Sequence, residues 1–166
     1  MRQGHLLTRP HCIIIMGVAG AGKTTLAKAL AERLDGSFLD ADELHPAASV
    51  EKMRQGIPLH DADRMPWLDA VANHAVQHSG KRPLVIACSA LKRAYRARLM
   101  RPKPVFVYLR GDRAAIEDRL RQRTGHYFNP ALADSQFDDL EEPDDAIVVP
   151  IEWPLRAAVD HVVGKF

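Results

Sequence analysis

Residues 17–24 read Gly17-Val18-Ala19-Gly20-Ala21-Gly22-Lys23-Thr24 and match the pattern G-x-x-x-x-G-K-[ST]. They follow five consecutive apolar residues, 12–16, and precede a stretch in which apolar residues recur at helical spacing. A short apolar run of this kind is typical of a parallel strand that is buried on both faces. The glycines then allow backbone N–H groups to turn toward phosphate oxygens at the start of the helix. The sequence therefore predicts a phosphate-binding loop between a buried strand and a helix.

The polar side chains of this predicted loop have separate expected roles. Lys23 is placed to reach the β- and γ-phosphates of a bound nucleotide. Thr24 opens the helix, where its hydroxyl can bind Mg²⁺, and Thr25 completes the phosphate-binding segment. The positive potential at the helix N-terminus favours the same anion. The alternative is a chance glycine-rich turn, and the agreement of every fixed position and of both flanking elements argues against it.

Length and composition are those of an ordinary globular domain. The 166 residues can bury a sizeable core, and 46% apolar with 27% charged residues is a common balance. The net charge of +2 comes from 23 basic and 21 acidic residues, which is too even a balance to predict a nucleic-acid or membrane surface. We therefore expect a single domain over residues 12–166 after a flexible lead-in at 1–11, with neither nucleic acid nor membrane as a partner.

The two cysteines lie at different ends of predicted strands. Cys12 begins one apolar run and Cys88 ends another. If these strands are parallel neighbours, the thiols lie at opposite ends of the sheet, too far apart for a disulfide. Free thiols fit a reducing cytoplasm, so we expect a cytoplasmic protein. No histidine or cysteine spacing is typical of zinc, and we expect no structural metal.

Strand-like and helix-like stretches alternate along the whole chain. This alternation predicts a three-layer α/β domain, in which a mostly parallel five-stranded sheet carries helices on both faces. Ligands of such sheets bind above the carboxyl ends of the strands. Gly36 is expected to cap the first helix and Pro66 to open the third. The predicted strands are 12–16, 38–39, 84–88, 105–109 and 147–149, and the predicted helices are 24–34, 46–56, 66–80, 92–100, 113–123 and one from 154.

Asp40 and Asp42 come directly after the second predicted strand. Residues two apart in an extended chain point the same way, so both carboxylates can face Mg²⁺ and a substrate hydroxyl. In a phosphoryl transfer one acid can order the metal while the other orients or deprotonates the attacking oxygen. The alternative is that one of them only caps the following helix. The nearby phosphate loop favours the functional interpretation, with Thr24 and Asp40 at the metal.

Arg119 and Arg123 lie four residues apart on one predicted helical face. Like charges at this spacing repel each other unless an anion lies between them, and a bound triphosphate is such an anion. The segment that follows, about 124–143, suits a lid that closes over nucleotide and excludes water. The alternative is a solvated basic helix end. A solvated role is the one we expect for the acidic residues Asp138, Asp139, Glu141, Glu142, Asp144 and Asp145.

Basic residues elsewhere indicate an acidic small substrate. Guanidinium groups recognise a carboxylate by a fork of two hydrogen bonds, and several arginines and lysines follow the third long strand or precede Trp67. The alternative is that these residues are ordinary surface charges. The candidate substrate-binding residues are Asp42, His45, Arg64, Ser89, Lys92, Arg96 and His126.

Several short blocks after the phosphate loop stand in a fixed order along the chain. They are 39–46 (LDADELHP), 51–53 (EKM), 56–59 (GIPL), 63–68 (DRMPWL), 88–92 (CSALK), 95–96 (YR), 125–126 (GH), 135–137 (SQF) and 140–141 (LE). With these blocks the chain resembles gluconokinases of the small P-loop type, relatives of shikimate and nucleoside-monophosphate kinases. The resemblance covers about residues 13–151, which is most of the chain.

This resemblance implies a P-loop kinase fold and an activity. The γ-phosphoryl group of ATP would pass to the 6-hydroxyl of D-gluconate with Mg²⁺, giving ADP and 6-phospho-D-gluconate for the pentose phosphate or Entner–Doudoroff pathway. The resemblance also implies a homodimer with a closing lid. It further suggests that Arg119 packs on adenine and that Arg123 contacts the transferring phosphate, so that Lys23, Asp40, Asp42 and Arg123 would carry the reaction.

Three residues depart from the usual pattern of this family. Ser49 and His60 each stand where an asparagine is common, and Tyr127 stands where the lid usually has phenylalanine. The first two neighbour the expected sugar-acid site, so the strictness for gluconate over other aldonates stays open. Two other functions stay open as well. One is a kinase of the same fold for another small acid or a nucleotide monophosphate, and the other is a nucleotide-binding regulatory module.

Overall fold

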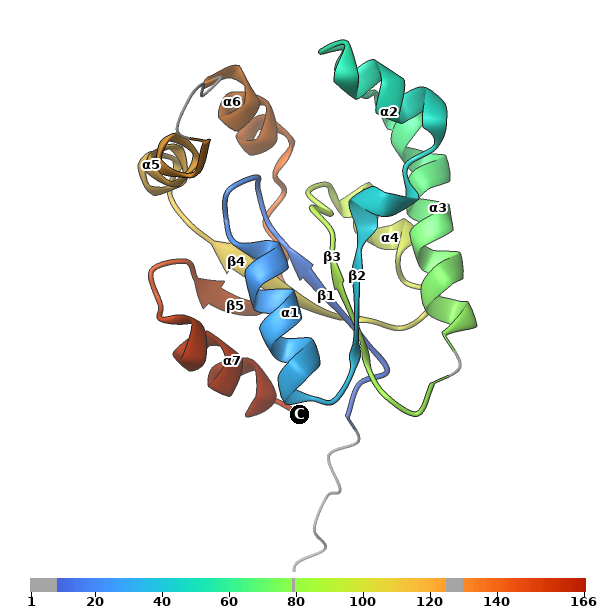
Figure 1. Cartoon of the computed structure of the whole chain (residues 1–166), viewed down its shortest axis with the longest axis vertical. Helices are drawn as coiled ribbons and strands as arrows, with labels where there is room; N and C mark the ends of the chain where they lie inside the picture. The colour runs from blue at the N-terminus through green and yellow to red at the C-terminus, as the bar shows by residue number, and fades with distance from the viewer. Residues whose placement is uncertain (1–8, 79, 125–129) are drawn as a thin grey trace, which may run out of the picture.

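The computed structural model describes residues 9–78, 80–124 and 130–166 (Figure 1). Five strands form one sheet in the order β2-β3-β1-β4-β5, and each neighbouring pair is parallel. The strands are β1 Cys12–Met16, β2 Ser37–Asp40, β3 Leu84–Ala87, β4 Val105–Arg110 and β5 Ile147–Pro150. The predicted α/β fold is confirmed, with a sheet that is parallel across all four pairings.

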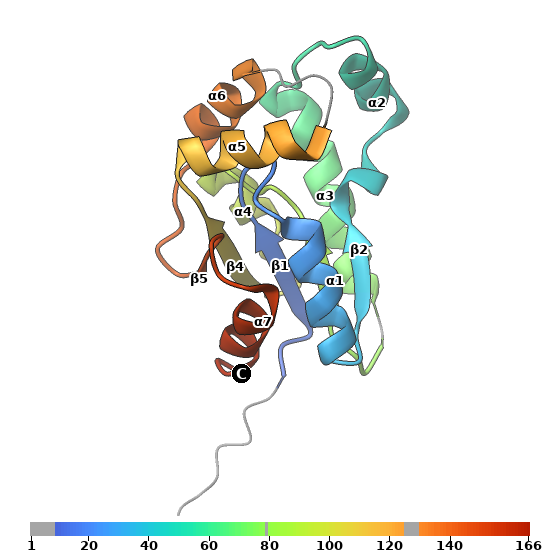
Figure 2. The same cartoon turned by 60° about the vertical axis from the view of Figure 1, so that its left-hand side comes forward.

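Helices connect successive strands and surround the sheet. They are α1 Lys23–Arg33, the 3-10 helix η1 Ala41–Leu44, α2 Ala47–Arg54, α3 Asp61–Gln77, α4 Arg93–Arg98, α5 Arg113–Thr124, α6 Pro130–Asp139 and α7 Leu155–Val163. In Figure 1, α2, α5 and α6 gather at the end of the sheet toward which β1 points. Figure 2 shows α5 running across the upper ends of β1 and β4.

The side chains of β1 hold the two helical layers to the sheet. Successive side chains of a strand point to opposite faces, so one apolar run supplies both interfaces. Ile13 and Ile15 belong to a buried cluster that includes Leu30 of α1 and residues of α5 and α7. Ile14 belongs to the cluster on the other face, which includes Trp67 of α3 and residues of α4. Burial of each such large apolar side chain stabilises the fold by about 1.5–3 kcal/mol.

The strand register aligns the carboxyl ends of three neighbouring strands. Asp40 at the end of β2 pairs with Ala87 at the end of β3, and Ala87 pairs with Ile15 of β1. The residues that follow these strands therefore emerge at one edge of the sheet. This register explains why polar residues from separate parts of the sequence meet there.

The start of α3 differs from the sequence prediction. We expected Pro66 to open this helix, but it begins at Asp61 and Pro66 lies inside it. The cause is a cap one turn earlier, because the carboxylate of Asp63 accepts a hydrogen bond from the backbone N–H of His60 at 3.1 Å. The helix therefore begins before Pro66, although this proline has no backbone N–H to donate within the helix.

The end of α1 also differs from its prediction. Asp35, not Gly36, adopts the left-handed conformation that closes the helix, with φ of 52°. A side chain at Gly36 would instead clash with the next segment, because its Cβ would lie 2.5 Å from the carbonyl oxygen of Pro83. Gly36 still helps to close the helix, because its N–H donates to the carbonyl oxygen of Ala31 at 2.7 Å, but its missing side chain is explained by close packing.

The acidic stretch after α5 contains a helix that the sequence pattern did not predict. The expected lid segment, 124–143, includes α6, which ends at Asp139. Residues 1–8 of the expected lead-in and 125–129 of the expected lid lie outside the described residues. In the described part of the chain, no helix has the length and apolar character needed to cross a membrane.

The two cysteines are free and buried, as predicted. Cys12 pairs in register with Leu84, four residues before Cys88, so the thiols stand at opposite ends of the sheet.

Candidate active site

The loop between β1 and α1 has the backbone shape expected of a phosphate cradle. Gly20 and Gly22 adopt φ of 82° and 95°, where a side chain would be strained. A Cβ on Gly20 would also lie 2.9 Å from the side chain of Leu120 in α5. Gly22 is the N-cap of α1 and has no side chain to satisfy the first N–H groups of that helix. These groups are suited to bind an anion.

The ammonium group of Lys23 lies against this loop. Its Nζ donates a hydrogen bond to the carbonyl oxygen of Val18 at 3.0 Å. Burial lowers the pKa of Lys23, and the negative charges of Asp42 and Asp40 oppose part of that effect, while Arg123 adds to it. Lys23 thus interacts electrostatically with two carboxylates and a guanidinium. Within this group the cations can neutralise phosphate charge.

The two acids after β2 have different surroundings. Asp40 caps η1, because its Oδ1 accepts the backbone N–H of Asp42 at 3.0 Å, so the alternative role of helix cap does exist for this residue. Asp42 lies at the cavity described below, with its Oδ1 3.6 Å from Nε2 of His45. That imidazole lowers the pKa of the Asp42 carboxyl, so the group is ionised at neutral pH.

His45 is held by an aromatic stack. Its ring lies 4.2 Å from that of Trp67, centroid to centroid, and the two planes are 16° apart. Trp67 is itself fixed by a hydrogen bond of 2.7 Å from its Nε1 to the carbonyl oxygen of Ala41. The side chain of His45 is only 5% exposed, and its Nδ1 has no hydrogen-bond partner in the described structure. His45 lines the cavity described below, although its Nδ1 itself is buried.

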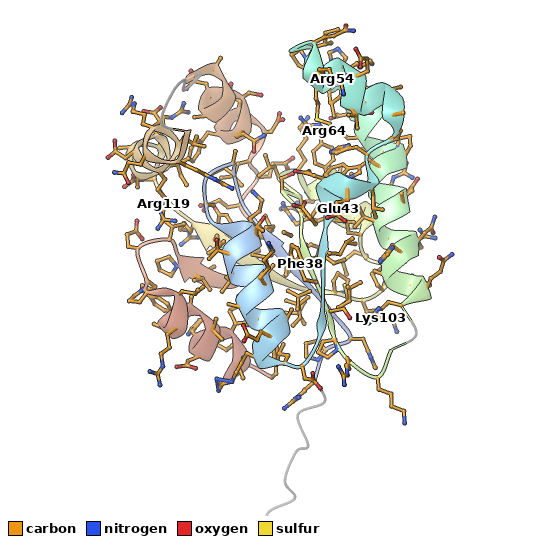
Figure 3. All side chains as sticks on the ribbon, viewed as in Figure 1. Phe38, Glu43, Arg54, Arg64, Lys103 and Arg119 are labelled. Atoms are coloured by element: carbon orange, nitrogen blue, oxygen red, sulfur yellow. The ribbon has the colours of Figure 1, made fainter. Side chains whose placement is uncertain are left out.

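A cavity of about 960 Å³ opens beside these groups. Its wall comes from η1, the connection between α2 and α3, the first turns of α3, the start of α4 and the inner side of α6. Of the predicted substrate-binding residues, Asp42, His45, Arg64, Ser89 and Lys92 line it. Figure 3 shows Arg64 below α2 and Arg119 below α5, on opposite sides of that view.

The cations of the cavity are paired with acids of the chain. Nζ of Lys92 lies 3.1 Å from Oδ1 of Asp61 and 3.7 Å from Oδ1 of Asp139. Nη1 of Arg64 lies 3.6 Å from Oδ2 of Asp139. The Tyr95 ring lies 5.5 Å from both cations, and its hydroxyl donates to Asp61 at 2.5 Å. Asp139 is therefore not merely solvated, which corrects the prediction for this residue.

Helix α6 reaches the phosphate loop as well as the cavity. The side-chain oxygen of Gln136 accepts the backbone N–H of Ala19 at 3.1 Å. No role was expected from the sequence for Gln136 or Tyr95, whereas Asp61 belongs to the polar connection before Trp67 that was expected to be able to face the cleft. The blocks SQF at 135–137 and LE at 140–141 and the expected lid over 124–143 pointed to this part of the chain, but not to Gln136 itself.

Arg96 does not fit the predicted substrate role. It is only 7% exposed, and its guanidinium donates to the carbonyl oxygens of Ala90, Leu91 and Glu141 at 2.8–2.9 Å. These bonds fix the segment after β3 to the segment after α6. Because the guanidinium of Arg96 donates to these backbone oxygens and does not line the cavity, it stabilises the neighbouring segments and is not placed to bind substrate.

The predicted nucleotide arginines lie on α5. Arg119 donates to the carbonyl oxygen of Ala21 at 3.3 Å and also to that of Ile151 after β5. It therefore joins the phosphate loop to the end of the sheet. Arg123 is exposed one turn further along. His126 lies outside the described residues.

The oxygen donors at the sheet edge fit Mg²⁺. Thr24 is in the first turn of α1, and the carboxylate of Asp40 is close enough to interact electrostatically with Lys23 of the same turn. Hydroxyl and carboxylate oxygens beside phosphate are the ligands that Mg²⁺ prefers.

Comparisons with known proteins agree with this geometry. A family model described as an AAA domain matches residues 12–142. The thermoresistant gluconokinase of Escherichia coli (strain K12) is 44% identical over 161 residues, covering 92% of this chain and 91% of that protein. The gluconokinase of Gluconobacter oxydans (strain 621H) is 44% identical over 141 residues, covering 82% and 79%.

A solved structure agrees as well. The crystal structure of a gluconokinase from Sinorhizobium meliloti 1021 superposes with a TM-score of 0.84 at 36% identity, covering 93% of this chain and 90% of that one. The chain therefore belongs to the gluconokinase family.

Proposed function

We propose that the protein transfers the γ-phosphoryl group of ATP to the 6-hydroxyl of D-gluconate, giving 6-phospho-D-gluconate and ADP. The observation that carries this proposal is that the phosphate loop and the cavity lie side by side at one edge of the sheet. A glycine loop built for phosphate adjoins a cavity that presents two cations, an ionised aspartate and a buried imidazole. An acceptor with a carboxylate and several hydroxyls complements that wall, and the family relatives carry the name gluconokinase.

The protein's part in the reaction is to position both substrates and to neutralise charge. The N–H groups of the loop and the ammonium of Lys23 bind the phosphates. Asp42 accepts the hydrogen bond of the acceptor's primary hydroxyl and takes its proton as the oxygen attacks. Arg123 offsets negative charge as the phosphoryl group moves, while Arg119 packs on the adenine.

The acceptor is held at its acidic end and along its hydroxyls. Arg64 and Lys92 bind the carboxylate, and His45 together with Ser89 contacts the hydroxyls. His126 is a further proposed substrate contact.

Magnesium completes the proposed site. Thr24 and Asp40 would hold the ion, partly through water, and the bound ion would shield phosphate charge. We also propose that the enzyme works as a homodimer in the cytoplasm, in line with the family resemblance and with its two free thiols.

An acceptor panel tests this function. ADP release in a coupled assay is measured with ATP, Mg²⁺ and, in turn, D-gluconate, other aldonates, shikimate and AMP. We expect gluconate to give the highest kcat/KM. A higher value with another acid would reassign the acceptor. ADP release that no acceptor stimulates would replace the kinase proposal with a nucleotide-hydrolysing regulatory module.

A further inference from the structure

The acceptor side of the cavity already holds a carboxylate that belongs to the chain. Asp139, the last residue of α6, points one oxygen toward each of the two cavity cations. Its Oδ2 lies 3.6 Å from Nη1 of Arg64, and its Oδ1 lies 3.7 Å from Nζ of Lys92. A carboxylate bridging two cations is the arrangement that an acidic substrate would adopt at the same place.

Asp139 is the loosely bound carboxylate of this group. Asp61 accepts hydrogen bonds from Tyr95 at 2.5 Å and from Lys92 at 3.1 Å. Both distances from Asp139 to the cations are longer than a hydrogen bond, so its contacts are ion pairs only. Such partly exposed ion pairs stabilise a protein little, and a better-placed anion can displace them.

The backbone that carries Asp139 is fixed on both sides. Three residues earlier, Gln136 accepts the N–H of Ala19 in the phosphate loop. Two residues later, the N–H of Glu141 donates to Leu91 at 2.9 Å, and the carbonyl of Glu141 accepts from Arg96. Displacement of the carboxylate therefore needs only rotation of the side chain, and the helix can stay in place.

We propose that Asp139 is an intramolecular competitor for the substrate's carboxylate at Arg64 and Lys92, and that it thereby sets the acceptor affinity and charge selectivity. This inference rests on the proposed function, because it requires an acidic acceptor at these cations. The formal charges of Arg64, Lys92, Asp61 and Asp139 sum to zero. A small anion without hydroxyls gains too little to displace Asp139, whereas an aldonate adds contacts along its hydroxyl chain.

The opposite role for Asp139 makes a different prediction. If its carboxylate only oriented the two cations for the substrate, its removal would weaken acceptor binding. The sign of the change in KM for gluconate therefore separates a competitor from an orienting support.

The test replaces Asp139 by asparagine, which keeps the shape and removes the charge. We expect KM for gluconate in Asp139→Asn to fall about fivefold to tenfold, with KM for ATP and kcat changing far less. Asp138→Asn is the matched control, because Asp138 is its exposed neighbour on α6 and the change in net charge is the same. Asp139→Ser removes the charge with a different shape and should lower KM in the same direction.

A neutral analogue gives a second readout. D-gluconamide keeps the hydroxyl chain but replaces the carboxylate by an amide, so Asp139 should not compete with it as an anion. Calorimetry should show gluconate binding tightened in Asp139→Asn and gluconamide binding tightened far less, because a neutral amide gains less than a carboxylate from the freed cations. A gluconate KM that is unchanged or raised, relative to Asp138→Asn, overturns the inference while leaving the kinase function in place. Wild-type protein that does not phosphorylate gluconate overturns the proposed function, and this inference with it.

Discussion

At the scale of single residues, the side chains expected to do chemistry are held by neighbours that the sequence does not reveal. Lys23 donates a hydrogen bond to the carbonyl oxygen of Val18, and burial lowers its pKa. Asp42 faces a histidine that is stacked on Trp67, and the hydrogen bond with this histidine lowers the pKa of its carboxyl. Replacement of Lys23 or of Asp42 should therefore change the steady-state kinetics in a defined way.

Removal of the Lys23 ammonium should abolish most of the turnover. We expect Lys23→Ala to lower kcat by about 10²–10³-fold, because a preorganised cation at the phosphates is lost. Lys28→Ala is the control, since Lys28 lies on the same helix but contacts the ring of Phe38. Steady-state kinetics with ATP and gluconate measures the effect, and near-normal turnover in Lys23→Ala would remove this residue from the mechanism.

Neutralising Asp42 should separate catalysis from nucleotide binding. In Asp42→Asn, kcat should fall by about 10²–10⁴-fold because the attacking hydroxyl loses its proton acceptor. The dissociation constant of ATP, measured by calorimetry, should stay near the wild-type value. Glu43→Gln changes the charge of the exposed neighbour and should leave kcat unaffected. An unaltered kcat in Asp42→Asn would transfer the role to Asp40 or to solvent.

At the scale of secondary-structure elements, apolar runs and the glycine loop were predictable, whereas caps and polar contacts were not. All five strands are present, and in β1, β3 and β4 at least four consecutive apolar residues leave few alternatives in a parallel sheet. The start of α3 was misplaced, since the bond between Asp63 and His60 outweighed the signal of Pro66. Helix α6 was missed because its short sequence lies in a polar, acidic stretch that we expected to form a lid segment without a helix.

For the candidate site, the residues next to predicted strands could be predicted, whereas the contacts between distant segments could not. Residues that follow a predicted strand, such as Asp42, Ser89 and Lys92, do line the cavity. The burial of Arg96 and the pairing of Arg64 with Asp139 depend on contacts across 45 and 75 positions of the sequence. Local pattern does not encode such contacts, so one arginine was misassigned and one aspartate was overlooked.

Arg96 should act on stability and not on substrate affinity. Arg96→Met keeps most of the apolar stem but removes the donor of the carbonyl oxygens of Ala90 and Glu141, while that of Leu91 keeps the N–H of Glu141. We expect the free energy of unfolding to fall by about 2–4 kcal/mol, while KM for gluconate changes less than about twofold. Denaturant titration measures the first and kinetics the second. Arg93→Met, on the same helix with a side chain 74% exposed, should unfold like the wild type. A large rise in KM with unchanged stability would restore the substrate role of Arg96.

At the scale of the whole molecule, one sheet with two buried faces positions every part of the site. The phosphate loop, the acids after β2 and the cavity residues after β3 meet because the strands are parallel and in register. The same sheet encloses both cysteines within the cluster that faces α3 and α4. Their reactivity therefore reports on the opening of the core.

Both thiols should be unreactive until the core opens. Burial raises the pKa of Cys12 and of Cys88 to about 12, so the native protein holds almost no thiolate at pH 8. We expect alkylation by iodoacetamide to become fast only in denaturant, in step with the loss of circular dichroism. Rapid alkylation of the native protein would contradict the burial of these strands.

The same pKa shifts give stability a pH dependence. An unfolded thiol loses its proton near the ordinary cysteine pKa of 9.0, while the folded thiol retains it. Above that pH the unfolded state binds fewer protons, so the free energy of unfolding should decrease as the pH rises. Replacement of both cysteines by serine would remove this contribution, and denaturant titrations between pH 8 and pH 10 would detect the difference.

The central claim is that the loop and the cavity together pass a phosphoryl group to a primary alcohol of a sugar acid. Phosphorus NMR of a reaction with ATP, Mg²⁺ and D-gluconate tests it most directly, because the product's phosphorus couples to the protons of its attached carbon. We predict a phosphomonoester signal split by the two protons of C6, growing in step with ADP. Formation of inorganic phosphate alone, with no phosphomonoester, would contradict the account.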